Sequence, residues 1–85
     1  MPYRVILSEE AASQLEALNK VMAERIVKKL KNIADNPARS FERLSGRKEL
    51  KLRVGDYRIL AIITHDENTI FIITLGHRRG IYKKH

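Results

Sequence analysis

The stretch Glu49-Leu-Lys-Leu-Arg-Val-Gly-Asp-Tyr-Arg58 predicts two β-strands joined by a tight turn. Its apolar residues alternate with charged ones, which is the period of two expected of a strand with one buried face. Gly55-Asp56 is a typical two-residue hairpin turn, and it would place Arg53 directly opposite Arg58. Like charges in such a pair cost a few tenths of a kcal/mol, roughly. A fold selected only for stability would avoid this pair, so we interpret it as a binding site for a polyanion.

The residues before this hairpin predict one strand and two helices. Residues 3–7 alternate like a short strand, and Ser8 is a typical helix N-cap followed by two glutamates. Two apolar stripes at helical spacing then continue to Asn36-Pro37, where the proline ends the helix. A single helix of this length is too long for so small a domain, so we expect a helical hairpin that bends near Leu18–Val21. The cations Lys20, Arg25, Lys28 and Lys31 are typical of a solvated helix face.

The rest of the chain predicts a loop over 37–48 and three strands, over 49–54, 57–64 and 69–75. The expected fold class is α+β. An N-terminal strand and a two-helix hairpin precede a three-stranded antiparallel meander, and the helices cover one face of the sheet. We expect one domain over residues 1–85.

The amino-acid composition restricts the partners and the cellular compartment that this chain can have. The 85 residues are 44% hydrophobic and carry a formal net charge of +7. This charge favours nucleic acid, an acidic protein or an anionic membrane as partner, although a generic basic surface would look the same. The absence of cysteine excludes disulfides and thiolate metal sites and favours a reducing cytoplasm. Neither a signal peptide nor a membrane-spanning run is recognisable.

The last two strands are apolar on both faces, although two helices can cover only one face of a small sheet. A four-residue turn between them predicts a partly bare apolar patch, which indicates a protein partner or a self-dimer unless the chain ends cover it. The patch consists of Leu60, Ile62, Phe71 and Ile73.

The same register brings basic groups from three strands to one end of one sheet face. Arginine and lysine bind phosphate well, but RNA cleavage also requires groups that transfer protons to and from the reacting oxygens. Candidates for proton transfer are His77, Tyr82 and Lys51, because neighbouring guanidinium groups favour a phenolate and a neutral amine. The predicted cluster is Lys51, Arg53, Arg58, His77 and Arg78.

The predicted order of elements, together with Leu44-Ser-Gly46, Leu52-Arg-Val-Gly-Asp-Tyr-Arg58 and Gly76-His-Arg-Arg-Gly-Ile-Tyr82, resembles the RelE family of toxin–antitoxin toxins. The resemblance covers nearly the whole chain. It implies a microbial-ribonuclease-like fold and an endonuclease that cuts mRNA in the ribosomal A site. Cleavage would proceed by attack of the 2′-OH on the adjacent phosphate, without a metal or cofactor. It also implies an acidic, RelB-like antitoxin as partner, with a heterotetramer as one allowed assembly.

By position, the resemblance implies that Lys51 acts as base or transition-state stabiliser. It also implies that Arg58 holds the phosphate and that Arg78 lies at the leaving group. Tyr82 would orient the nucleotide or help to transfer a proton, with Arg53 and His77 in support. Glu49 stands where well-studied members have a lysine, which removes one cation. Flanking cations expected to bind RNA are Arg43, Arg47, Lys48, Arg79, Lys83 and Lys84, and the apolar patch is expected to bind the antitoxin.

Two other functions fit the sequence. One is a ParE-type toxin, which poisons DNA gyrase without nuclease chemistry, although such chains generally lack the combined Arg58, Arg78 and Tyr82 pattern. The other is an RNA-binding module that does not cleave.

Overall fold

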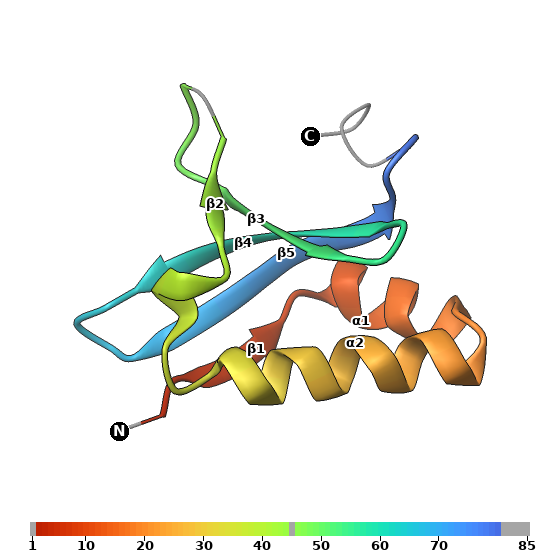
Figure 1. Cartoon of the computed structure of the whole chain (residues 1–85), viewed down its shortest axis with the longest axis horizontal. Helices are drawn as coiled ribbons and strands as arrows, with labels where there is room; N and C mark the ends of the chain where they lie inside the picture. The colour runs from red at the N-terminus through yellow and green to blue at the C-terminus, as the bar shows by residue number, and fades with distance from the viewer. Residues whose placement is uncertain (1, 45, 81–85) are drawn as a thin grey trace.

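The computed structural model describes residues 2–44 and 46–80, which form a five-stranded sheet with two helices packed on one face (Figure 1). The order of strands is β1-β5-β4-β3-β2. Strand β1 pairs in parallel with β5, and every other pair is antiparallel. The α+β arrangement expected from the sequence is confirmed. The strands are β1 (Arg4–Leu7), β2 (Glu42–Arg43), β3 (Leu50–Val54), β4 (Tyr57–Thr64) and β5 (Thr69–His77).

The predicted helical hairpin is present, with α1 at Glu9–Ala17 and α2 at Lys20–Ile33. Each helix begins at a side-chain cap: Ser8 Oγ accepts a hydrogen bond from the N–H of Ala11, and Asn19 Oδ1 accepts one from Met22. Capping of this kind contributes about 1 kcal/mol per helix. The break at Leu18 lies where the bend was expected.

The prediction of an unbroken loop over 37–48 is wrong. A short 3₁₀ helix, η1 (Pro37–Arg39), follows α2, and strand β2 adds an edge to the sheet beside β3. The side chain of Phe41 is buried in the core between these two elements. A two-residue strand has no periodicity to read, so only its pairing with β3 identifies it.

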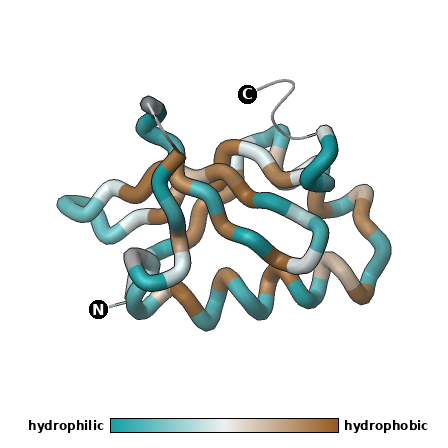
Figure 2. Tube along the Cα trace, turned by 45° about the horizontal axis from the view of Figure 1, so that its top comes forward, coloured by the Kyte–Doolittle hydropathy of each residue, from teal (hydrophilic) through white to brown (hydrophobic). Residues whose placement is uncertain are grey.

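The hydrophobic core lies between the helices and the sheet face that they cover. Along α2 and along the strands, hydrophobic and hydrophilic residues alternate in Figure 2. The fully buried side chains from the two layers include Ile26 of α2, Leu52 of β3, Ile59 of β4 and Ile72 of β5. The opposite face of the sheet is covered by neither helix.

A β-bulge in β5 changes the expected register of the meander. Strands β3 and β4 pair as predicted, with Arg53 opposite Arg58. Strands β4 and β5 also pair as predicted from Thr64–Thr69 to Ala61–Ile72, but Leu60 then pairs with Thr74. Ile73 is therefore an extra residue, and every pair beyond it is shifted by one. Arg58 lies opposite Gly76, whereas a four-residue turn without a bulge would place it opposite Leu75.

Helix α1 holds the bulged strand in place. The hydroxyl of Ser8 donates a hydrogen bond to the carbonyl oxygen of Ile73 at 2.6 Å. Beyond the bulge, Gln14 Oε1 accepts hydrogen bonds from the N–H of Leu75 at 2.8 Å and from the hydroxyl of Thr74 at 3.0 Å. Since β1 ends at Leu7, these side chains bond the part of β5 that β1 does not reach.

We expect Gln14→Ala to destabilise the fold by about 1–3 kcal/mol, because it leaves the buried Leu75 N–H and Thr74 hydroxyl without their acceptor. Equilibrium urea unfolding measures the loss. The matched control is Ser13→Ala, an exposed neighbour on the same helix. Equal unfolding midpoints for the two variants would contradict this role of Gln14.

Candidate active site

The turn between β3 and β4 orients Arg58. Gly55 takes a φ of +59°, which fits a type II′ hairpin turn with glycine at its first central position. The Nη1 atom of Arg58 donates hydrogen bonds to the carbonyl oxygens of Gly55 at 3.1 Å and of Tyr57 at 3.0 Å. The half-buried guanidinium is thereby fixed against the turn. A fixed guanidinium loses less entropy when it binds a phosphate.

Arg78 lies at the same corner of the sheet, because its backbone is tied to that turn. The N–H of Arg78 donates a hydrogen bond of 2.8 Å to the carbonyl oxygen of Asp56. A further bond, from the N–H of Gly80 to the carbonyl oxygen of His77, closes the turn after β5. The side chain of Arg78 is exposed. The hairpin motif that contains Asp56 and the C-terminal motif that contains Arg78 are far apart in the sequence, and this backbone hydrogen bond joins them.

His77 does not continue the face of Arg58, so this expectation is wrong. The bulge places His77 opposite Tyr57, and successive residues of a strand point to opposite faces. The two rings meet edge to face, with their centroids 5.8 Å apart. The Nδ1 atom of His77 accepts a hydrogen bond of 3.3 Å from the N–H of Arg79. In this arrangement His77 stabilises the turn that contains Arg78.

Lys51 and Arg53 share one face of β3 with Arg58 on β4, as predicted. The Nζ atom of Lys51 lies 3.7 Å from a carboxylate oxygen of Glu42, a residue that no sequence motif indicates. Glu42 comes from β2, opposite Lys51 in the ladder. The pair holds the lysine beside the arginines and offsets one positive charge of the cluster.

The predicted RNA-binding residues divide between two ends of the sheet. Arg79 is exposed beside Arg78. At the other end, Arg43, Arg47 and Lys48 line an open hollow of about 500 Å³ together with Leu50, Ile62, Ile63 and His65. Within that hollow, Arg47 Nε lies 3.3 Å from a carboxylate oxygen of Glu49. Glu49 therefore offsets the charge of a flanking arginine. Tyr82, Lys83 and Lys84 lie outside the described residues.

An apolar row of side chains crosses the uncovered face of the sheet. Phe71 of β5 lies between Ile6 of β1 and Ile62 of β4 in the ladder, and the three residues are 38%, 40% and 39% exposed. The prediction holds for Ile62 and Phe71, and Ile73 is half-buried at the bulge. It is wrong for Leu60, which is completely buried. Ile6 was missed because β1 was not paired with β5 in the sequence analysis.

Residues 2–44 and 46–80 contain no group of three or more histidine, aspartate or glutamate side chains that could hold a metal ion. Neither helix in this part of the chain is long and apolar enough to cross a membrane.

Fold and site together define a small basic α+β protein. Two helices cover one sheet face, while the other face carries Lys51, Arg53 and Arg58 together with an exposed apolar row. The chain belongs to the ParE toxin family of type II toxin–antitoxin systems, whose family model matches residues 5–82.

Individual relatives agree with this assignment. A RelE-like toxin protein of Escherichia coli is 30% identical over 81 residues, which cover 92% of this chain and 85% of the relative. The RelBE2 toxin–antitoxin complex of Mycobacterium tuberculosis contains a chain that matches with a TM-score of 0.81 and 25% identity, covering 92% and 93% of the two chains. A mutant of the E. coli toxin RelE in the free state matches with a TM-score of 0.75 and 24% identity, covering 98% and 93%. The resemblance to RelE-type toxins is confirmed.

Proposed function

We propose that this toxin is an endoribonuclease that cuts mRNA in the ribosomal A site in the cytoplasm. The observation that carries the proposal is the hydrogen bond from Arg78 N–H to the carbonyl oxygen of Asp56, which holds Arg78 beside the turn that orients Arg58. A guanidinium on the open sheet face and a second one in the adjoining turn suit a phosphate that becomes more negative in the transition state.

The proposed reaction is attack of a ribose 2′-OH on the adjacent phosphate. The 2′-oxygen loses its proton as it bonds to phosphorus, and the bond from phosphorus to the 5′-oxygen breaks. The products are a 2′,3′-cyclic phosphate and a 5′-OH, which takes up a proton. Arg58 holds the phosphate and Arg78 stabilises the charge on the leaving oxygen. Lys51 supplies a further cation or the base, and Tyr82 is the other candidate for proton transfer.

We further propose that an acidic, RelB-like antitoxin neutralises this toxin. The M. tuberculosis structure is a RelBE2 toxin–antitoxin complex, and a further structural match, from Pyrococcus horikoshii, is a RelE–RelB complex. In this chain, the exposed row Ile6–Phe71–Ile62 offers an apolar contact surface beside Ile73, and the net charge of +7 favours an acidic partner. A heterotetramer of two toxins and two antitoxins is one assembly that this surface allows.

Primer extension on a reporter message after brief induction of the toxin alone tests the ribonuclease. We expect new 5′ ends within translated codons, and we expect them to disappear when the start codon is removed. Growth arrest with intact message would contradict cleavage and would instead support a toxin that acts on DNA gyrase. Absence of both effects would contradict the toxin activity itself.

A further inference from the structure

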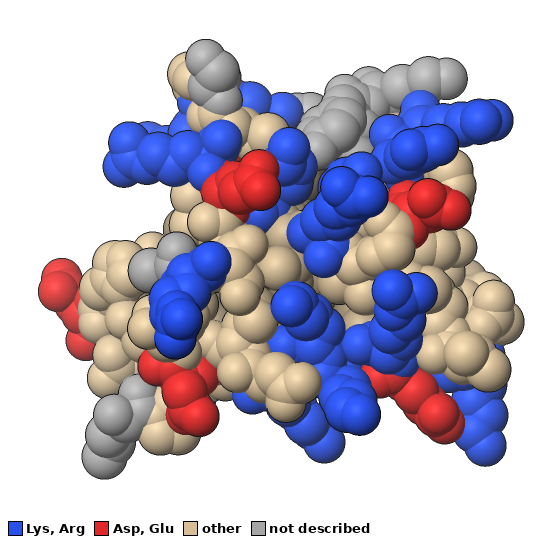
Figure 3. All heavy atoms as spheres, viewed as in Figure 1, with Lys and Arg blue, Asp and Glu red and all other residues tan. Residues whose placement is uncertain are grey.

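A basic groove runs between α2 and the end of β3 on the edge of the sheet that β2 leaves open. Strand β2 pairs only with Leu50 and Lys51, so the following residues of β3 have no strand on that side within the described part of the chain. The groove has a volume of about 270 Å³. It is lined by Arg25, Lys28, Lys29 and Asn32 of α2 and by Arg53, Val54 and Gly55 of the hairpin. Figure 3 shows Lys and Arg side chains gathered over this part of the molecule.

The packing of Arg25 against the hairpin turn shapes one end of the groove. A Cβ atom on Gly55 would lie 3.0 Å from Nη1 of Arg25 and 3.4 Å from its Cζ. Glycine at position 55 therefore provides the positive φ of the turn and also the space for this guanidinium. Lys28, Lys29 and Asn32 follow Arg25 at spacings of three, four and seven residues, which places all four side chains along one side of α2.

Carboxylates offset two cations elsewhere in the described part of the chain. Lys51 pairs with Glu42, and Arg47 pairs with Glu49. No carboxylate of residues 2–44 and 46–80 forms an ion pair with the four cations of the groove. Like charges that line one groove repel each other, and they come from two separate elements. The interpretation of Arg25 and Lys28 as part of an ordinary solvated face does not explain this convergence with Arg53.

We propose that this groove binds the phosphate backbone of RNA, outside the segment held at the candidate active site. The inference rests on the proposed function, because Arg53 lines the groove and also lies opposite Arg58 at the active site. An RNA backbone that leaves the candidate active site can thus cross the open edge of β3 and reach α2. Cationic grooves that follow a backbone bind nucleic acid without regard to sequence.

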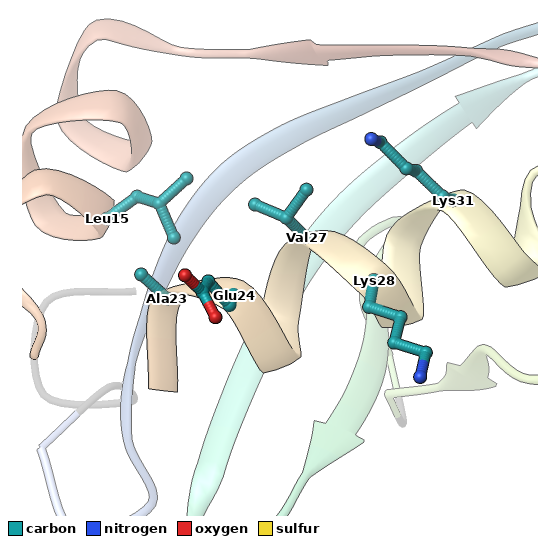
Figure 4. Close-up of a pocket in the computed structure, with 6 residues that line it drawn as sticks. All are labelled: Leu15, Ala23, Glu24, Val27, Lys28 and Lys31. Carbon is teal, nitrogen blue, oxygen red and sulfur yellow. The ribbon is translucent and has the colours of Figure 1, made fainter. Parts of the chain in front are cut away.

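A second groove extends along the side of α2 that faces α1 and has a different composition. It is lined by Leu15 of α1 and by Ala23, Glu24, Val27, Lys28 and Lys31 of α2 (Figure 4). Its apolar side chains suit burial against a protein segment. The basic groove offers only Val54 as an apolar side chain, so its composition favours phosphates over a protein.

Fluorescence anisotropy with a labelled RNA hairpin tests the groove. Every protein in the experiment carries Arg78→Ala so that the RNA stays intact. The test variant adds Lys28→Gln and Lys29→Gln, and the control adds Lys20→Gln and Lys31→Gln, which remove the same charge from the same helix outside the groove. Affinities are measured over a series of salt concentrations. We expect the test variant to reduce the slope of log K against log[salt] by about 1 for each lost phosphate contact, and the control to leave the slope nearly unchanged. Thermal melting verifies that both variants are folded.

Equal slopes for the two variants would overturn the proposal. So would unchanged RNA binding together with weaker binding of the antitoxin by the test variant, because an acidic protein segment would then occupy the groove. A reduced slope in a toxin that fails the primer-extension test would support the groove as a nucleic-acid site while contradicting the ribonuclease function.

Discussion

We expect Arg78→Ala to abolish growth arrest and to lower the rate of message cleavage by about 10²–10³-fold. Only the backbone N–H of Arg78 bonds to Asp56, so the substitution removes an exposed side chain and leaves the turn intact. The same loss is expected for Arg58→Lys, which keeps the positive charge but cannot reproduce the fork of donors fixed by Gly55 and Tyr57. Single-turnover cleavage on programmed ribosomes measures both rates.

Arg79→Ala is the matched control for this experiment. Arg79 is an exposed arginine in the same turn, and its backbone N–H bonds to His77 whatever side chain it carries. The control should lower the cleavage rate much less than Arg78→Ala, because it removes only a flanking cation. Full toxicity of Arg78→Ala and Arg58→Lys would show that the active site has been assigned wrongly.

Phe71→Asp should yield a toxin that its antitoxin can no longer neutralise. Phe71 is the middle residue of the exposed apolar row, and a carboxylate there would have to be desolvated in the complex and would repel an acidic partner. Central aromatic residues of an interface commonly contribute 2 kcal/mol or more, so we expect at least a roughly 30-fold weaker complex. Calorimetric titration measures the affinity, and growth on co-expression of the antitoxin gives the cellular result.

The control for this variant is Val21→Asp. Val21 is 77% exposed on α2, which packs on the other face of the sheet, so the same change of chemistry occurs far from the apolar row. The control should remain fully neutralised. Normal neutralisation of the Phe71→Asp toxin would mean that the antitoxin binds elsewhere, for example in the apolar groove between α1 and α2.

Local patterns were sufficient to predict much of this fold. The alternation around Gly55-Asp56 fixed the pairing of Arg53 with Arg58, because a two-residue turn allows only one register. Ser8 marked the start of the first helix, and the weak break at Asn19 is in fact the cap of the second. Each of these features depends on residues close together in the sequence.

The features that could not be predicted depend on contacts between distant segments. An apolar run such as Ile70-Phe-Ile-Ile73 has no alternation that would reveal an extra residue, so the bulge and the reversed face of His77 were missed. Gln14 looked like an ordinary polar residue of a helix, although it bonds a strand 60 residues away. Arg78 could be selected from its motif, but its meeting with Asp56 became visible only in the structure.

The pairing of the first strand with the last has a consequence for how the toxin is made. Strand β1 pairs with β5, and β5 also lies beside β4 inside the sheet. A nascent chain that ends before Thr69 therefore lacks the partner of β1 and the residues that α1 bonds. Such long-range pairing closes a large loop and forms late. The corner of the sheet at which Arg78 meets the turn before Arg58 is therefore assembled only after β5 has been translated.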